Sequence, residues 1–316
     1  MSFGWRINMN IFSAIELQQA QILLFFQSIR TPFLNGVFIP ITITAEGILA
    51  VLISTVLYWC ISKRYGIRLI YSLLLNMAIN VFVKDFFRIE RPIGKYGIES
   101  IRERTATGYS FPSGHTQNAS SLWSSLAICI RKKWIYAVAF VMTIAVALSR
   151  LYLGVHWPTD VIAGAIFGLI GSAISISIID SYEKKQNFNI LYIVIIVMVI
   201  GFALNKGTEY TRIFGASFGA TMGYIVETKF IGFKTIEEKR KTKGYNPKSD
   251  IGNYIKRYII GTVSLGAVYI GLKYISAPVV HSESEFIKNM VYFIRYMITV
   301  FWGTAVVPAI FVKMGI

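Results

Sequence analysis

The chain has 316 residues, of which 54% are hydrophobic and only 15% are charged, against about 25% charged residues in an ordinary soluble domain. This composition excludes a disordered chain, a collagen-like chain and a disulfide-rich scaffold, and it indicates an integral membrane protein. The net charge of +16 is compatible with binding to nucleic acid, to anionic lipid or to an anionic substrate. It is also compatible with basic loops that orient a membrane protein. The positions of the charges decide between these.

The first 30 residues predict a helix that does not cross the membrane. Polar residues interrupt its apolar pattern, namely Glu16, Gln18, Gln19, Gln21 and Gln27. Ser13 and Glu16 match a capping box, which would start a helix there, with apolar residues at helical spacing behind it. We therefore expect residues 1–33 to form an amphipathic helix at the membrane interface. The segment lacks the basic start, apolar core and cleavage site of a secretory signal peptide.

Apolar stretches of about membrane length follow along the rest of the chain. A helix needs about 20 residues to cross an apolar layer about 30 Å thick, and the third and sixth stretches are short by that measure. The predicted spans are 36–61, 66–86, 115–130, 134–152, 158–180, 189–205, 211–231, 258–274 and 289–311. We expect an all-α fold, a polytopic transmembrane helical bundle, with nine spans to within one.

The basic residues gather in alternate loops between these predicted spans. One side carries residues 63–68, 131–133, 184–185 and 229–257, and finally Lys313. The positive-inside rule makes this side cytoplasmic, and the mixed Glu and Lys sequence of 232–257 indicates a solvated connector. The charge is therefore explained without nucleic acid. The opposite side holds residues 84–113, the turn around His156 and a loop that contains His281.

Glycines recur every fourth residue in two of the predicted spans. They are Gly164 and Gly168 in the fifth span, and Gly215, Gly219 and Gly223 in the seventh. Small residues let helix backbones approach closely, so we expect these glycines to pack helices inside the bundle. A dimer interface is the alternative.

Three short segments place polar groups at the ends of predicted spans, all on the non-cytoplasmic side. Their sequences are KDFFRIERP, GYSFPSGHTQ and SRLYLGVHWPTD. The chemistry-bearing residues they contribute are Lys84, Arg91, Ser113, Gly114, His115, Arg150, His156 and Asp160. Two of the three histidines in the chain fall in these segments, whereas His281 has no such setting and is expected in a surface loop.

These residue types together predict a site for phosphate chemistry. The lysine and two arginines are fixed cations, and an arginine fork matches phosphate oxygens. Ser113 and Gly114 open a helix, where free N–H groups favour an anion. Asp160 lies four residues after His156 and can fix its tautomer, which leaves His115 to protonate a leaving oxygen. The segments lack the carboxylate cluster that would hold Mg²⁺, so we expect neither a metal nor a cofactor.

Each residue also has a structural interpretation when it is taken alone. Ser113 is often only an N-cap, and Asp160 only a favourable acid in a first helical turn. Lys84 can extend to the interface without binding anything, and Arg91 can anchor a loop. The combination on one membrane face favours the functional interpretation.

The pattern Lys84-x6-Arg91-Pro92, Pro112-Ser113-Gly114-His115 and Ser149-Arg150-x5-His156-x3-Asp160 resembles the signature of the type 2 phosphatidic acid phosphatase (PAP2, lipid phosphate phosphatase) family. The resemblance covers roughly residues 30–180. It implies that His156 is the nucleophile and forms a phosphohistidine, with Asp160 as its partner and His115 as the general acid. It implies an extracytoplasmic catalytic face and no metal. The phosphate-binding residues that it implies are Lys84, Arg91, Ser113, Gly114 and Arg150.

The expected organisation is an interfacial helix over 1–33, a PAP2-like catalytic core over 34–180, and C-terminal transmembrane helices of unknown role over 181–316. The expected protein is a multi-pass plasma-membrane phosphatase of a bacterium, with membrane lipid around it and a lipid phosphate as substrate. Candidate substrates are undecaprenyl diphosphate, phosphatidylglycerol phosphate, phosphatidic acid and sphingoid-base phosphates.

Extra basic residues beside the motifs favour a diphosphate substrate such as undecaprenyl diphosphate. These residues, which could hold a second phosphate, are Arg88, Lys95, Arg102 and Arg104. Their alternative role is only to attract anionic substrates to the surface. Two other functions stay open: a phosphotransferase that passes phosphate to a second lipid or sugar, and a transporter or lipid-binding protein that keeps the fold without hydrolysis.

Overall fold

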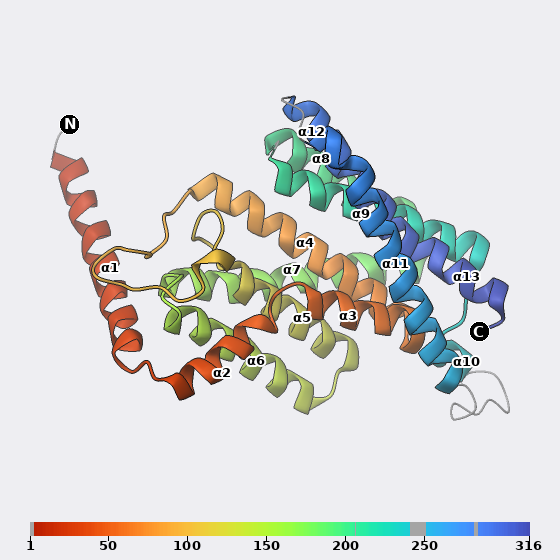
Figure 1. Cartoon of the computed structure of the whole chain (residues 1–316), viewed down its shortest axis with the longest axis horizontal. Coiled ribbons are helices and arrows are strands. Elements are labelled where there is room, and N and C mark those ends of the chain that lie inside the picture. The colour runs from red at the N-terminus through yellow and green to blue at the C-terminus, as the bar shows by residue number, and fades with distance from the viewer. Residues whose placement is uncertain (1–2, 206, 241–250, 281–283) are drawn as a thin grey trace. The chain divides into compact units, whose positions relative to one another are not determined.

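The computed structural model describes residues 3–205, 207–240, 251–280 and 284–316 (Figure 1). Every regular element in these ranges is helical and none is a strand, which confirms the all-α prediction. The α-helices are α1 (Phe3–Ser28), α2 (Pro32–Ile43), α3 (Ile48–Val56), α4 (Lys63–Phe87), α5 (Gly114–Ile130), α6 (Lys133–Tyr152), α7 (Pro158–Lys185), α8 (Asn189–Leu204), α9 (Thr208–Val226), α10 (Ile236–Lys239), α11 (Ile251–Val280), α12 (Glu285–Phe301) and α13 (Val307–Met314). Shorter turns are η1 (Leu57–Ile61), η2 (Glu103–Thr105), η3 (Glu227–Ile231) and η5 (Trp302–Val306).

Five helical segments in the described ranges are long and apolar enough to cross a membrane: α4, α6, α7, α11 and the continuous stretch from α12 to α13. The bent pair α1–α2 would make a sixth. The nine predicted spans all fall on helices, but α5 has 17 residues and α8 has 16, which is short for a full crossing. By length and composition, five or six of the described helical segments can cross a membrane, fewer than the nine expected. The protein is still a polytopic helical membrane protein, as predicted.

The first predicted span, 36–61, is wrong as a single helix. Helix α2 ends at Ile43, and α3 begins at Ile48 after a turn. That turn contains Glu46, which forms an ion pair with Arg102 at 2.8 Å. A carboxylate in the middle of an apolar helix would be costly to leave unpaired, so the interruption puts Glu46 where a partner can reach it.

Helix α1 begins earlier than the predicted capping box. It starts at Phe3 and runs unbroken to Ser28, so Ser13 lies inside the helix and the predicted start is wrong. No glycine or proline lies between residues 5 and 28 to interrupt the helix. Ala20 and Leu23 are fully buried, whereas Ile15 and Ile22 are exposed. The placement of this helix at a membrane interface stays a prediction.

Residues 1–47 and 83–170 form one compact part of the chain, called unit 1. Helices α5 and α7 pack closely inside it, because Gly164 lies against the backbone of Ser113 and Gly168 lies against Ser120. A methyl group at Gly164 would come within 2.7 Å of the Ser113 carbonyl oxygen. These two glycines therefore pack helices within the chain, as predicted.

Residues 48–82 and 171–316 form a second compact part, unit 2. Helices α9 and α12 approach closely where Gly215 and Gly219 face the backbone of Phe293 and Met297. Gly223 faces Thr304 in the same way. The second predicted glycine stripe thus also packs helices within the chain. Most of the connector 232–257 is described, whereas its part 241–250 and His281 lie outside the described residues.

Candidate active site

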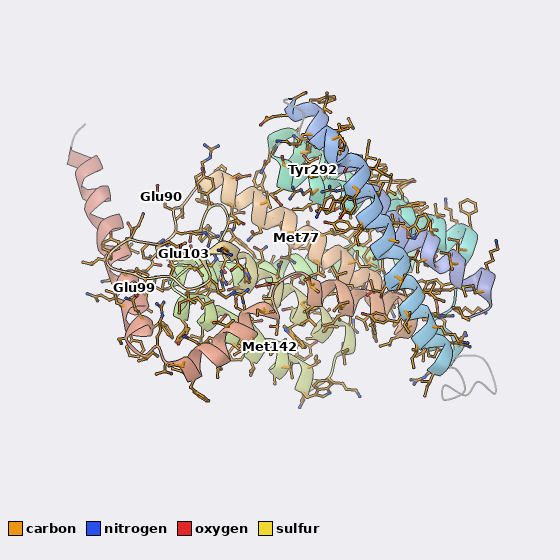
Figure 2. All side chains as sticks on the ribbon, viewed as in Figure 1. Met77, Glu90, Glu99, Glu103, Met142 and Tyr292 are labelled. Carbon is orange, nitrogen blue, oxygen red and sulfur yellow. The ribbon has the colours of Figure 1, made fainter. Side chains whose placement is uncertain are left out.

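The loop from α4 to α5 and the turn from α6 to α7 are joined by hydrogen bonds in unit 1. The Trp157 indole donates to the Glu90 carbonyl at 2.9 Å, and the Ser113 amide donates to the Asp160 carbonyl at 3.0 Å. Glu90, Glu99 and Glu103 are labelled in the long loop in Figure 2. The three motifs, far apart in the sequence, therefore meet at one place.

Gly154 shapes the turn that leads to His156. Its φ is +70°, a conformation that side chains other than glycine rarely adopt. A methyl group at this position would also lie 2.9 Å from the Glu99 carbonyl oxygen. Glycine thus lets the α4–α5 loop close over the turn that carries the histidine.

His156 and Asp160 form the predicted pair. His156 Nδ1 lies 3.2 Å from Asp160 Oδ2, and both side chains are buried. The same carboxylate oxygen accepts hydrogen bonds from the Ser110 hydroxyl at 2.5 Å and from the Trp157 amide at 2.8 Å. The carboxylate is fixed by these donors, so it holds the imidazole with its proton on Nδ1.

Arg91 contacts the other ring nitrogen of His156. Its Nη1 lies 3.0 Å from His156 Nε2, and it also donates to the Val155 carbonyl at 2.9 Å. Further hydrogen bonds run from this guanidinium to the carbonyls of Thr107 and Gly108. Because an arginine has only donors, Nε2 presents its lone pair towards the cation.

The protonation of these two groups follows from burial and charge. Burial, and then the nearby Arg91 cation, lower the pKa of His156 well below its ordinary value. Burial lowers the pKa of Arg91 to about 10, so the guanidinium still carries its charge at neutral pH. A neutral imidazole therefore faces a cation, which is the state of a histidine ready to act as a nucleophile.

Arg150 is fully buried in the last turn of α6. Its Nη1 donates to the Thr42 hydroxyl at 2.9 Å. Its Nε and Nη2 are buried and have no hydrogen-bond partner among the described residues. Buried donors without partners are costly, so an oxyanion bound at this position would satisfy them.

Helix α5 begins at this site. Ser113 is its N-cap and accepts from the Thr116 hydroxyl at 3.1 Å and from the Thr116 amide at 3.5 Å. The first N–H groups of a helix, here those of Gly114 and His115, have no partner within the helix and favour an anion. His115 Nε2 is buried with no hydrogen-bond partner among the described residues.

Lys84 completes the set, in the last turn of α4. It is partly buried and interacts electrostatically with Arg91, Arg150 and Asp160. All eight residues that the sequence singled out therefore belong to one neighbourhood of unit 1. The described part of the chain has no cluster of three or more His, Cys, Asp or Glu side chains that could hold a metal ion.

The extra basic residues near the motifs behave differently. Arg102 is paired with Glu46 at 2.8 Å, and Lys95 with Glu90 at 3.0 Å. Their charge is partly neutralised by these carboxylates, so they are weaker candidates for a second phosphate than the sequence suggested. Arg88 and Arg104 are exposed.

Three partners in the site were not identified from the sequence. Ser110 and the Trp157 amide hold Asp160, and Thr42 holds Arg150. Ser110 lies inside the second motif, three residues before Ser113, and this nearness was the available signal. Thr42 and a backbone amide carry no signal that sets them apart in the sequence.

The fold and the site define a polytopic helical membrane protein with a buried histidine–aspartate pair inside a group of three cations. The sequence matches the description "PAP2 superfamily" over residues 65–184. It also matches "PAP2 superfamily phosphatase, transmembrane extension" over residues 211–316. The chain therefore belongs to the PAP2 superfamily, and its C-terminal helices match a known extension of such phosphatases.

The chain is also similar to several named proteins. The chain is 30% identical to an undecaprenyl-diphosphatase of Sulfolobus acidocaldarius over 40% of this chain and 60% of that protein. It is 27% identical to a lipid A 4'-phosphatase of Bacteroides thetaiotaomicron over 48% of this chain and 72% of that protein. A crystal structure of a PAP2-type phosphatidylglycerolphosphate phosphatase from Bacillus subtilis matches at 25% identity and a TM-score of 0.43, over 55% of this chain and 88% of that one.

Proposed function

We propose that this protein is a lipid phosphate phosphatase that works through a phosphohistidine on His156. The observation that carries the proposal is the geometry of one ring. Nδ1 of His156 lies 3.2 Å from Asp160 Oδ2, and Nε2 of the same ring lies 3.0 Å from Arg91 Nη1. The buried, unpartnered donors of Arg150 lie on the same site and suit a phosphate oxygen.

The first chemical step is attack of His156 Nε2 on phosphorus. The nitrogen–phosphorus bond forms as the phosphorus–oxygen bond to the lipid breaks. The negative charge of the bound phosphate favours the protonated form of His115, which gives its proton to the leaving lipid oxygen, and Asp160 stabilises the charge that develops on the His156 imidazole. The cations Lys84, Arg91 and Arg150 neutralise the phosphoryl oxygens.

The second step regenerates the enzyme. A water molecule attacks phosphorus, the bond to His156 Nε2 breaks, and His115 takes the proton that the water releases. The balance is one phosphate ester and one water consumed, with one lipid alcohol and one phosphate released. For a diphosphate substrate, the leaving group is a lipid monophosphate.

The proposed substrate is a lipid phosphate or diphosphate, with undecaprenyl diphosphate as the first candidate. The name of the Sulfolobus relative supports this choice. The pairing of Arg102 with Glu46 weakens the argument for a second phosphate site, which leaves Arg88 and Arg104 as the exposed cations nearby. If Arg102→Ala and Arg104→Ala reduce monophosphate and diphosphate hydrolysis equally, the diphosphate preference is wrong.

We further propose that the site faces the extracytoplasmic side of a bacterial plasma membrane. The basic residues that begin α4 and α6 and end α7 are at the opposite helix ends from the motif residues, and the positive-inside rule assigns basic ends to the cytoplasm. We keep 1–33, 34–180 and 181–316 as the proposed division into interfacial helix, catalytic core and C-terminal extension.

A phosphate-release assay tests the proposed activity. The purified full chain is given undecaprenyl diphosphate, phosphatidylglycerol phosphate, phosphatidic acid and a sphingoid-base phosphate, each with and without chelator. We expect release from at least one lipid, no loss with chelator, and no turnover by His156→Ala. Full activity of His156→Ala would refute the mechanism. Release that requires an added acceptor would favour a phosphotransferase, and binding without release would favour a transporter.

A further inference from the structure

Unit 2 contains a buried arginine without a counter-ion among the residues that the structure describes. Arg295 lies in the middle of α12, inside the long apolar segment Glu285–Met314. Its side chain is 9% exposed, and its Nε is buried without a hydrogen-bond partner. Among the described residues it forms no ion pair within 4.0 Å. An ionisable side chain inside a span is costly and points to a function.

A second arginine lies close to the first. Arg212 is in the second turn of α9, and its Nη1 forms an ion pair with Glu209 at 2.7 Å. The Glu209 side chain is 68% exposed, so the pair is screened by solvent and adds little. The Nε of Arg212 is buried and also lacks a hydrogen-bond partner in the described ranges. Two cations are therefore set against one exposed carboxylate.

Both guanidinium groups lie against the same tyrosine ring. The Arg212 carbon Cζ is 4.2 Å from the centre of the Tyr292 ring, and that of Arg295 is 4.8 Å from it. Arg295 also lies 5.3 Å from the Tyr296 ring, which itself packs against Tyr269. Tyr292 is labelled on α12 in Figure 2. These five residues are called the arginine–tyrosine cluster.

The backbone under the cluster is held in place by close helix packing. Gly215 and Gly219 of α9 meet the backbone of Phe293 and Met297 of α12. Arg212 is one turn before the first of these contacts, and Arg295 lies between them on the facing helix. The two guanidinium groups are thus presented by a rigid helix pair, which reduces the ordering cost of binding a ligand.

The chemistry of the cluster suits a phosphate group. Arginine donors form a planar fork that matches phosphate oxygens, and they are held here in a region of low polarity where such contacts are strong. Tyrosine faces stabilise the cations only in part, and the Nε donors of Arg212 and Arg295 have no hydrogen-bond partner among the described residues. Nothing in the cluster resembles the His156–Asp160 pair: its members are arginines and tyrosines, so it can bind phosphate but has no nucleophile–base pair to cleave it.

The two helices that carry Arg295, Tyr292, Tyr296 and Tyr269 also expose apolar side chains. Ile294 and Met290 on α12, and Ile270 on α11, are each more than 40% exposed. A ligand whose phosphate lies on the arginines would therefore find apolar side chains on the same helices for its hydrocarbon part. This arrangement fits a lipid better than a water-soluble phosphate compound.

We propose that the arginine–tyrosine cluster of the C-terminal extension binds the phosphate group of an anionic lipid, as a non-hydrolytic site made by residues other than those of the active site. The proposal does not depend on the catalytic activity. It gives the transmembrane extension a lipid-binding role.

Native mass spectrometry of the full chain in detergent, titrated with phosphatidylglycerol, tests the proposal. We expect Arg295→Gln and Arg212→Gln each to weaken lipid binding about tenfold, because each removes charge-assisted hydrogen bonds. Lys273→Gln is the matched control, since it removes a cation from an exposed position on the neighbouring α11 and should leave binding unchanged. Equal binding by the wild type and both arginine variants would overturn the proposal.

Two further sets of measurements distinguish a folding defect from a binding defect, and a lipid ligand from free phosphate. If Arg295→Gln does not fold, Arg212→Gln carries the test, and unchanged lipid binding by this variant overturns the proposal. Hydrolysis of a soluble phosphate ester by the folded variants should equal that of the wild type, which separates this site from the active site. Displacement of the lipid by inorganic phosphate, but not by chloride of equal ionic strength, supports a site that accepts free phosphate as well. No displacement supports recognition of the lipid alone.

Discussion

Arg150 in unit 1 and Arg295 in unit 2 are buried arginines on long helices, and both have guanidinium nitrogens without a hydrogen-bond partner among the described residues. Their neighbours differ. The site of Arg150 also contains the His156–Asp160 pair, whereas Arg295 lies against tyrosine rings. Under our proposals both arginines bind an anion, and only the arginine with an oriented imidazole beside it takes part in cleavage.

Asp160→Asn is expected to give the largest effect, since it breaks the histidine–aspartate pair, which has no counterpart among the described residues of unit 2. An amide cannot hold the imidazole in the required tautomer or stabilise its charge, so kcat should fall about 10⁴-fold, as in other histidine–aspartate pairs. Steady-state phosphate release measures this. Glu103→Gln, which changes an exposed carboxylate of the α4–α5 loop, is the control and should change kcat less than about twofold. A small effect of Asp160→Asn would remove the main difference between the two regions.

The two arginines can be compared directly by the substitutions Arg150→Lys and Arg295→Lys. Lysine keeps the charge but loses the planar fork, so kcat/KM should fall about 10²-fold or more at Arg150 if its donors hold a phosphoryl oxygen. The same change at Arg295 should leave hydrolysis of a soluble phosphate ester unchanged. Equal losses in the two variants would show that both arginines only support the fold, which thermal unfolding of the variants would reveal.

Ser110→Ala is expected to give a smaller loss, because Ser110 acts through Asp160. Its hydroxyl donates to Asp160 Oδ2, and the Trp157 amide still donates to the same oxygen after the change. A hydrogen bond to a charged group contributes about 1.5–3 kcal/mol, so kcat should fall roughly tenfold or somewhat more. KM should stay constant, and Ser110→Thr should restore part of kcat. A raised KM with constant kcat would contradict this positioning role.

The smallest expected effect is a change in the pH profile, which tests the electrostatics of the site. In the proposed mechanism neutral His156 is the nucleophile. Burial together with the Arg91 cation lowers its pKa, so activity should persist below the ordinary histidine pKa of about 6.5. Arg91→Ala removes a positive charge that disfavours the imidazolium, so the pKa of His156 should rise and the acid limb of kcat/KM should move to higher pH. An acid limb that stays in place, or moves to lower pH, contradicts this electrostatic account.

The sequence predicted the helical membrane fold, and it singled out the eight residues that the structure brings together, because both depend on strong local patterns. Long apolar runs require helices in a membrane, and histidine, aspartate and arginine are rare enough in such a chain for their spacing to carry information. Ser110 and Thr42 were missed because serine and threonine are common in helices and caps, so neither signals a role until its neighbours are known.

The errors in the fold have physical causes of the same kind. At the break between α2 and α3, Glu46 meets Arg102, a contact between residues 56 positions apart that no local pattern contains. The prediction that a helix starts at Ser13 was wrong because α1 continues on the N-terminal side of this residue, as far as Phe3. Arg212 and Arg295 were not brought together, since only the packing of α9 on α12 places both against Tyr292.

Detection of the covalent intermediate tests the central claim most directly. The full chain is mixed with a lipid substrate labelled with ³²P in the phosphate that is cleaved, and the reaction is quenched within one turnover. We predict a protein-bound label that is stable in base and labile in acid, located on the peptide that contains His156, and absent from His156→Ala. Turnover by the wild type with no such label, or with the label on another residue, would contradict the assignment of His156 as the nucleophile.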